Sequence, residues 1–329
     1  MLLSVLWLVV GLAAILVGAN LLVDGSSALA KRLGMSDLLV GLTVVAFGTS
    51  TPELAISVIS AAEGSTQIAV GNVVGSNTAN ILLIIGMTAL VRPIAVTRTV
   101  MTRQMPLMVL SAFVLLLLGN SGTLNGTGVN MITRTDGIVL MLLCALFMIY
   151  TVKTAQRPDV SPAEEPEVKS TSPMPLWRCV VYVLVGLAGL VWGGDRFVDG
   201  ASELARAMGV SEAVIGLTIV AVGTSMPELA ASVVAAWKGN SDLAVGNVIG
   251  SNIFNVTLVL GASAAVRPLQ FGAIGNVDLG VLCVASLLFW LMGRVIGRRT
   301  ITRGEGAALL CLYAAYLIWL VINAQPGVN

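Results

Sequence analysis

The sequence predicts an all-α membrane protein with ten transmembrane helices in two inverted five-helix repeats. Three observations predict this fold: the composition, ten separate apolar stretches and an internal duplication. Of the 329 residues, 57% are hydrophobic and 11% are charged, whereas about a quarter of the residues in a soluble domain are charged. This composition makes the lipid bilayer the expected partner. The net charge of +1 gives no sign of nucleic acid binding, and we expect no obligatory protein partner.

The apolar stretches have lengths typical of membrane-spanning helices, which need about 20 residues each. The first stretch has no basic segment before it, so we interpret it as a spanning helix and not as a signal peptide. The ten stretches lie at 2–22, 38–62, 68–91, 104–119, 135–152, 177–197, 212–237, 243–266, 276–293 and 305–323.

One hydrophilic stretch interrupts the chain between the fifth and sixth apolar stretches. It contains acidic residues and several prolines, which is typical of a flexible linker. It is too short for a folded regulatory domain. We therefore expect an N-terminal five-helix repeat at 1–152, a linker at 153–176 and a C-terminal five-helix repeat at 177–329.

The two predicted repeats are related by a shift of 175 positions. This shift aligns Val23–Pro93 with Val198–Pro268 without a gap, and 39 of the 71 positions are identical. Such similarity indicates internal duplication. Because each repeat has an odd number of helices, the second must enter the membrane in the opposite orientation, as in many secondary transporters.

The basic residues predict which side of the membrane each loop faces. Loops after the odd-numbered helices contain fourteen basic residues, and the opposite side contains four. The positive-inside rule makes the first side cytoplasmic, so we expect a cytoplasmic linker and both termini outside. The fourteen are Lys31, Arg32, Arg92, Arg98, Arg103, Lys153, Arg157, Lys169, Arg178, Lys238, Arg294, Arg298, Arg299 and Arg303; the four are Arg134, Arg196, Arg206 and Arg267.

The second and seventh predicted helices each carry the motif G-T-S-x-P-E within an apolar run. It ends in Glu53 in the first repeat and Glu228 in the second. A carboxylate at membrane depth is costly and marks a functional site by default. Proline interrupts helical hydrogen bonding and frees carbonyl groups of the preceding turn. Carboxylate, carbonyl and hydroxyl oxygens together are the ligands that hard cations prefer.

The third and eighth predicted helices carry the motif G-N-x-x-G-S-N-x-x-N, at Gly71–Asn80 and Gly246–Asn255. Its glycines would allow close approach to the second and seventh helices, and its serine and last asparagine share one helical face. Each motif alone has a structural explanation, a proline kink or a packing face. Their duplication at one offset favours a site, with helices 2, 3, 7 and 8 all broken around it.

The paired motifs resemble the two alpha-repeats of the cation/calcium exchanger superfamily. The resemblance covers both repeats and implies a cation site formed by four helices, with no cofactor. It also implies alternating access through movement of the first and sixth helices. The implied ligands of calcium and sodium are Glu53 and Glu228, hydroxyl or carbonyl oxygens of Thr49, Ser50, Thr224 and Ser225, the carbonyls of Ala46 and Ala221, and the side chains of Ser76, Asn80, Ser251 and Asn255.

The resemblance implies a sodium/calcium antiporter of the minimal prokaryotic form, a multi-pass protein of the inner or plasma membrane. Several relatives, notably potassium-dependent exchangers, carry Asp at the position of Asn255, which argues against potassium co-transport here. The equivalent residues Asp24 and Asp199 lie near helix ends among other charges. For these two, a cap or an ion pair is favoured over cation binding.

Three other functions remain to be compared with sodium/calcium exchange. A proton/calcium antiporter would use the same glutamates, but such relatives usually have an acidic residue where this chain has Ser76-Asn77 and Ser251-Asn252. A cation channel usually has rotational symmetry and not inverted duplication. An intramembrane enzyme is disfavoured, because the chain has no histidine and no nucleophile–base pair stands out.

Overall fold

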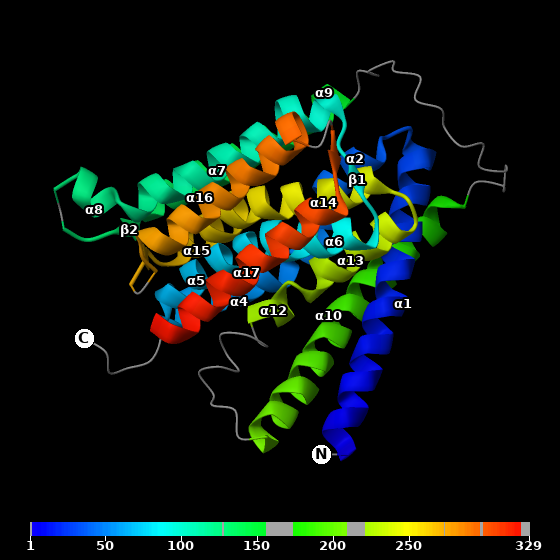
Figure 1. The fold of residues 1–329 in the computed structure, drawn as a ribbon. Helices are drawn as coiled ribbons and strands as arrows, with labels where there is room; N and C mark the ends of the chain where they lie inside the picture. Colours follow the sequence, from blue (N-terminus) through cyan, green and yellow to red (C-terminus); the bar gives the residue numbers. More distant parts are fainter. Residues whose placement is uncertain are drawn as a thin grey trace.

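The protein is an assembly of helices in which two long helices lie obliquely against the rest (Figure 1). The computed structural model describes residues 2–126, 128–155, 174–208, 221–272, 274–296 and 299–323. Most of the predicted linker and the predicted helical residues 212–220 lie outside the described residues. The described part confirms an all-helical membrane protein, with four two-residue strands.

The elements of the first half extend to Ala155, just inside the predicted linker; η denotes a π-helical turn. They are α1 (Leu2–Leu33), α2 (Asp37–Val40), η1 (Gly41–Val45), α3 (Ala46–Thr49), α4 (Thr51–Glu63), α5 (Thr66–Ala79), η2 (Asn80–Ile84), α6 (Ile85–Val91), β1 (Ile94–Ala95), η3 (Val100–Gln104), α7 (Met105–Gly119), α8 (Ser121–Leu124), β2 (Met131–Ile132) and α9 (Arg134–Ala155).

The described elements of the second half repeat much of this order. They are α10 (Leu176–Ala207), α12 (Ala221–Thr224), α13 (Met226–Trp237), α14 (Ser241–Phe254), η5 (Asn255–Val259), α15 (Leu260–Val266), β3 (Leu269–Gln270), α16 (Asn276–Leu291), η6 (Met292–Ile296), β4 (Thr300–Ile301) and α17 (Arg303–Asn323).

Eight described helices are long and apolar enough to cross a membrane, and a ninth crossing is formed by two helical segments that meet at a bend of 43°. The bend separates Asp37–Thr49 from Thr51–Glu63, so the predicted break of helix 2 is confirmed. A similar break at Ser225 separates α12 from α13. Proline at the start of α4 and of α13 explains both, because proline fits the first helical turn but not the interior.

The prediction that helices 3 and 8 are also broken is wrong. Thr66–Val91 and Ser241–Val266 each form one continuous span. Neither span contains a proline, and each instead accommodates a π-helical turn, which begins at Asn80 or Asn255. Such turns occur frequently at functional sites.

The helices α1 and α10 run antiparallel and lie side by side along most of their length (Figure 1). A Cβ atom added to Gly11 would lie 2.7 Å from the carbonyl oxygen of Gly193, and one added to Gly18 would lie 2.8 Å from that of Gly186. Only glycine allows two backbones to approach this closely. Both helices are about ten residues longer than predicted, because their polar ends continue the same helical pairing.

The two halves of the chain interleave. Strand β1 pairs with β4, and β2 pairs with β3, so each ladder joins one half to the other. The last helix of each half packs on the other half, α9 against α15 and α17 against α6. At the centre, α14 is buried over nearly its whole length. The motif helices are therefore held by contacts from both halves.

Candidate cation site

Glu53 and Glu228 lie in the first turns of α4 and α13, directly after the two helix breaks. Each side chain is only 1% exposed. Ser50, which precedes the helix that carries Glu53, donates a hydrogen bond to Glu228, so the two glutamates face one site. No third acidic, histidine or cysteine side chain joins them in a cluster within the described part of the chain. The site therefore holds two buried carboxylates, contributed by the two halves of the molecule.

Each carboxyl group accepts a hydrogen bond at one oxygen. Ser76 Oγ donates to Glu53 Oε1 over 3.5 Å, and Ser50 Oγ donates to Glu228 Oε1 over 3.1 Å. The first bond stays within one repeat and the second joins the two repeats. Both Oε2 atoms are buried and have no hydrogen-bond partner in the described structure.

Further side-chain oxygen atoms of the predicted ligand residues are also buried without hydrogen-bond partners among the described residues. A buried, unpaired polar atom costs free energy, of the order of 1–3 kcal/mol, and calls for an explanation such as an unseen ion. Carboxylate, amide and hydroxyl oxygens are the ligands expected for Ca²⁺ and other hard cations. Besides the two Oε2 atoms, they are Asn80 Oδ1, Asn255 Oδ1, Ser225 Oγ and Ser251 Oγ.

Two asparagines that we did not predict as site residues connect the motif helices. Asn72 Nδ2 donates to the Glu53 carbonyl oxygen over 3.3 Å and to Ser57 Oγ over 3.0 Å. Asn247 Nδ2 makes the equivalent bonds to the Glu228 carbonyl and to Ser232, over 3.4 and 3.0 Å. They are the first asparagines of the duplicated motif, and their identity in both repeats was the signal that could have found them.

The backbone near the first break differs from the predicted picture of a free carbonyl at Ala46. This carbonyl accepts hydrogen bonds from the Ser50 N–H over 3.0 Å and from the Thr49 hydroxyl over 3.4 Å. The Thr49 hydroxyl also lies 3.1 Å from Asn247 Oδ1. In the second repeat, the Ser225 N–H donates to the Val222 carbonyl over 3.1 Å. The structure therefore brings both backbone segments to the breaks, and the Ala46 carbonyl is hydrogen-bonded there and not free.

The motif glycines of the second repeat allow the predicted close approach. A Cβ atom on Gly246 would lie 2.8 Å from the Leu38 carbonyl, and one on Gly250 would lie 2.6 Å from the Ala46 side chain. Gly71 and Gly75 have no such backbone neighbour in the described structure. The segment equivalent to the one that Gly246 and Gly250 contact lies outside the described residues.

The carboxylates of Asp24 and Asp199 form ion pairs, as predicted. Lys238 Nζ lies 2.7 Å from Asp24 Oδ1, and Arg196 Nη1 lies 3.4 Å from Asp199 Oδ2. Both aspartates are about half exposed. These ion pairs account for the charges of Asp24 and Asp199, so no role in cation binding is needed to explain them.

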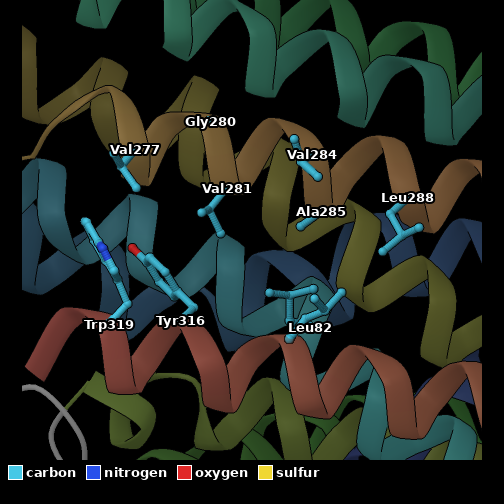
Figure 2. Close-up of a pocket in the computed structure, with 10 residues that line it drawn as sticks. Leu82, Val277, Gly280, Val281, Val284, Ala285, Leu288, Tyr316 and Trp319 are labelled. Atoms are coloured by element: carbon cyan, nitrogen blue, oxygen red, sulfur yellow. The ribbon is translucent and has the colours of Figure 1, made fainter. Parts of the chain in front are cut away.

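A cavity of about 460 Å³ lies between α16 and α17 and is separate from the carboxylates. Figure 2 shows Val281, Val284 and Leu288 of α16 on one side, Tyr316 and Trp319 of α17 on the other, and Leu82 of η2 beside them. The Tyr316 hydroxyl donates to Asp278 Oδ1 over 2.8 Å. The lining is otherwise apolar, so this cavity lacks the oxygen ligands of a cation site.

Comparisons with known proteins identify the family. The sequence profile of the sodium/calcium exchanger protein family matches residues 3–153 and 179–322. CaxA of Alkalimonas amylolytica is 39% identical over 322 residues, which cover 96% of this chain and 98% of the relative. The sodium/calcium exchanger MaX1 of Methanosarcina acetivorans is 30% identical over 340 residues, which cover 95% of this chain and 97% of the relative.

A solved structure agrees with these sequence relatives. The sodium-calcium exchanger NCX_Mj, in a structure without Na⁺ and Ca²⁺, superposes with a TM-score of 0.81 and 30% identity. The match covers 97% of this chain and 99% of that chain. The fold and the relatives point to the same family. The chain has interleaved helices and two broken helices with buried carboxylates, and its relatives include sodium/calcium exchangers. The chain is a multi-pass membrane protein that belongs to the sodium/calcium exchanger family.

Proposed function

We propose that this protein is a sodium/calcium antiporter that exchanges Na⁺ for Ca²⁺ at a site containing Glu53 and Glu228. One observation supports the proposal: both repeats contribute a buried carboxylate and further buried oxygen atoms that have no hydrogen-bond partner among the described residues. The proposed ligand set retains the predicted residues, and Ca²⁺ and Na⁺ are its transported substrates. Asn80 and Asn255 are the first residues of the two π-turns. No cofactor and no enzymatic reaction are part of the proposal.

The charge of the site gives a physical basis for exchange. Two ionised glutamates carry a charge of −2, which one Ca²⁺ or several Na⁺ ions can compensate. An empty site would leave two buried charges unpaired, which is expensive in a membrane. The loaded forms should therefore cross between the two faces more readily than the empty form. Measurement of ⁴⁵Ca uptake into proteoliposomes under imposed sodium or proton gradients tests this function.

The proposed architecture has ten spanning helices in two inverted repeats, at 1–152 and 177–329. The antiparallel pairing of α1 with α10, the equivalent first helices of the repeats, supports the inversion. The reciprocal ladders and the reciprocal packing of α9 and α17 support a two-fold relationship. The segments α12 and α13 lie within the seventh predicted helix, 212–237.

Alternating access would come from movement of α1 and α10 relative to the other helices. Their backbones are in close contact at glycines seven residues apart along each helix, so the pair can move as one unit. This proposal assigns the glycines to the movement and the carboxylates to ion binding.

The Gly18→Ala variant tests the role of this helix pair. Its Cβ atom would lie 2.8 Å from both the Gly186 carbonyl oxygen and the Leu190 nitrogen, so the helices must separate. We expect lower calcium flux per folded molecule and a loss of about 1–3 kcal/mol in stability, measured by uptake and by thermal unfolding in detergent. Gly280→Ala, where a Cβ atom meets nothing within 4 Å, is the control. Unchanged calcium flux in Gly18→Ala would argue that transport does not require the close packing of α1 against α10.

We further propose that the linker faces the cytoplasm and that both termini face outward, in a prokaryotic inner or plasma membrane. The distribution of fourteen basic residues on one side and four on the other supports this orientation. A cysteine introduced by Ser161→Cys, in a variant without the four native cysteines, should resist a membrane-impermeant thiol reagent in intact cells. It should react once the cells are permeabilised. Labelling in intact cells would reverse the proposed orientation.

A further inference from the structure

A pair of hydrogen bonds at the interface between the repeats involves Asn77, whose side chain is 1% exposed. Asn77 Nδ2 donates to the Asn252 carbonyl oxygen over 3.1 Å. Asn77 Oδ1 accepts from Asn255 Nδ2 over 3.0 Å. Asn77 belongs to α5, whereas Asn252 and Asn255 lie at the junction of α14 and η5. Both ends of this amide are therefore engaged by the opposite repeat.

The direction of these bonds matters for Asn255. An asparagine side chain has one oxygen acceptor and one NH₂ donor group, and only the oxygen can bind a cation. Because the Asn255 NH₂ group donates to Asn77, its oxygen points elsewhere, and it is buried without a partner in the described structure. Asn77 is itself held in one orientation, because its own NH₂ group donates to a backbone carbonyl.

The equivalent residue of the other repeat does not make the equivalent contacts. Asn252 Nδ2 donates over 2.8 Å to Val248 of its own helix, and Asn252 Oδ1 has no partner among the described residues. Asn252 therefore does not orient Asn80 as Asn77 orients Asn255. The orienting contact is made in one direction only, although the two asparagines occupy the same motif position.

We propose that Asn77 is a positioning residue that turns the side-chain oxygen of Asn255 toward the bound cation. The inference rests on the proposed function, because it assigns Asn255 as a cation ligand. Residues that orient metal ligands are typically worth about 10- to 100-fold in metal affinity. The expected effect of losing Asn77 is therefore a weaker affinity for Ca²⁺ and not only a less stable protein.

The test compares Asn77→Ala in two backgrounds, by titrating purified protein with Ca²⁺ in detergent at low Na⁺. In the wild-type background, we expect Asn77→Ala to raise the Kd for Ca²⁺ by about 10-fold. In the Asn255→Asp background, both oxygens of the carboxylate can bind a cation, so no orientation is required. There the same substitution should change the Kd by no more than about twofold, which is the scatter between independent sites.

Three further variants distinguish a loss of Asn255 orientation from general packing damage and from the loss of the proposed ligand itself. Thr78→Val removes a neighbouring buried hydroxyl that donates to the Val74 carbonyl of its own helix, and should retain wild-type affinity. Asn77→Asp keeps an acceptor for the Asn255 NH₂ group, so it should bind Ca²⁺ more tightly than Asn77→Ala does. Asn255→Ala tests the ligand itself and should weaken binding.

The outcomes distinguish the two hypotheses. Normal Ca²⁺ binding by Asn255→Ala would contradict the proposed ligand set and, with it, this inference. If Asn255→Ala binds weakly but Asn77→Ala binds normally, only the positioning role is overturned. An equal fold-change for Asn77→Ala in the wild-type and Asn255→Asp backgrounds would also overturn it, because a packing defect does not depend on residue 255.

Discussion

Calcium flux is expected to fall more than about 100-fold when either Glu53 or Glu228 is replaced by Gln, while the protein remains folded. Even residues that only orient metal ligands are worth about 10- to 100-fold in affinity, and each glutamate supplies half of the negative charge of the proposed site. Glutamine keeps the size and one carbonyl oxygen of the side chain but removes the charge. The measurement is ⁴⁵Ca uptake into proteoliposomes, with size-exclusion chromatography as the test of folding.

Glu63→Gln is the matched control for this experiment. Glu63 lies on the same helix as Glu53, but at its exposed C-terminal end, so its replacement should leave uptake unchanged. Sodium-driven calcium exchange retained in both Glu53→Gln and Glu228→Gln would exclude the proposed site. Loss of uptake in Glu63→Gln as well would show that the assay responds to general damage and not to the buried carboxylates.

Much of the fold is predictable from the sequence, because lipid imposes simple rules on length and polarity. The limits of the apolar stretches match most described helices within a few residues. The exceptions have physical causes. The polar segment after Val23 carries no hydropathy signal of a membrane span, yet it continues α1 because it still packs beside α10. The predicted breaks of helices 3 and 8 accompanied the duplicated motifs, but without a proline the backbone forms a π-turn instead.

The site is predictable in composition but not in detail. The duplicated motifs are sufficient to predict Glu53 and Glu228, because a carboxylate at membrane depth needs compensation. Identical motifs cannot predict where the two repeats differ. Asn77 bonds across the interface while Asn252 bonds within its own helix, and Ser50 reaches the opposite glutamate. These differences arise from how the repeats pack against each other, which neither motif contains.

An outward-directed sodium gradient is expected to drive calcium uptake into proteoliposomes, whereas a pH gradient alone is not. Apart from the two glutamates, the proposed side-chain ligands are neutral oxygen donors: Thr49, Ser50, Ser76, Asn80, Thr224, Ser225, Ser251 and Asn255. Hydroxyl and amide oxygens can coordinate Na⁺ but do not carry a transported proton near neutral pH. A site that used only protons would need the two carboxylates and not this set of buried oxygen atoms.

Protons should still compete for the site, because either glutamate has an unpaired Oε2 atom that a proton could occupy. We therefore expect acidification on both sides of the membrane to inhibit sodium-driven calcium uptake and not to drive it. The measurement is initial ⁴⁵Ca uptake at several pH values with a fixed sodium gradient, and with potassium in place of sodium as the control. Calcium transport driven by a pH gradient, with no effect of sodium, would replace sodium/calcium exchange by proton/calcium antiport, because the same two carboxylates would then carry protons in place of Na⁺.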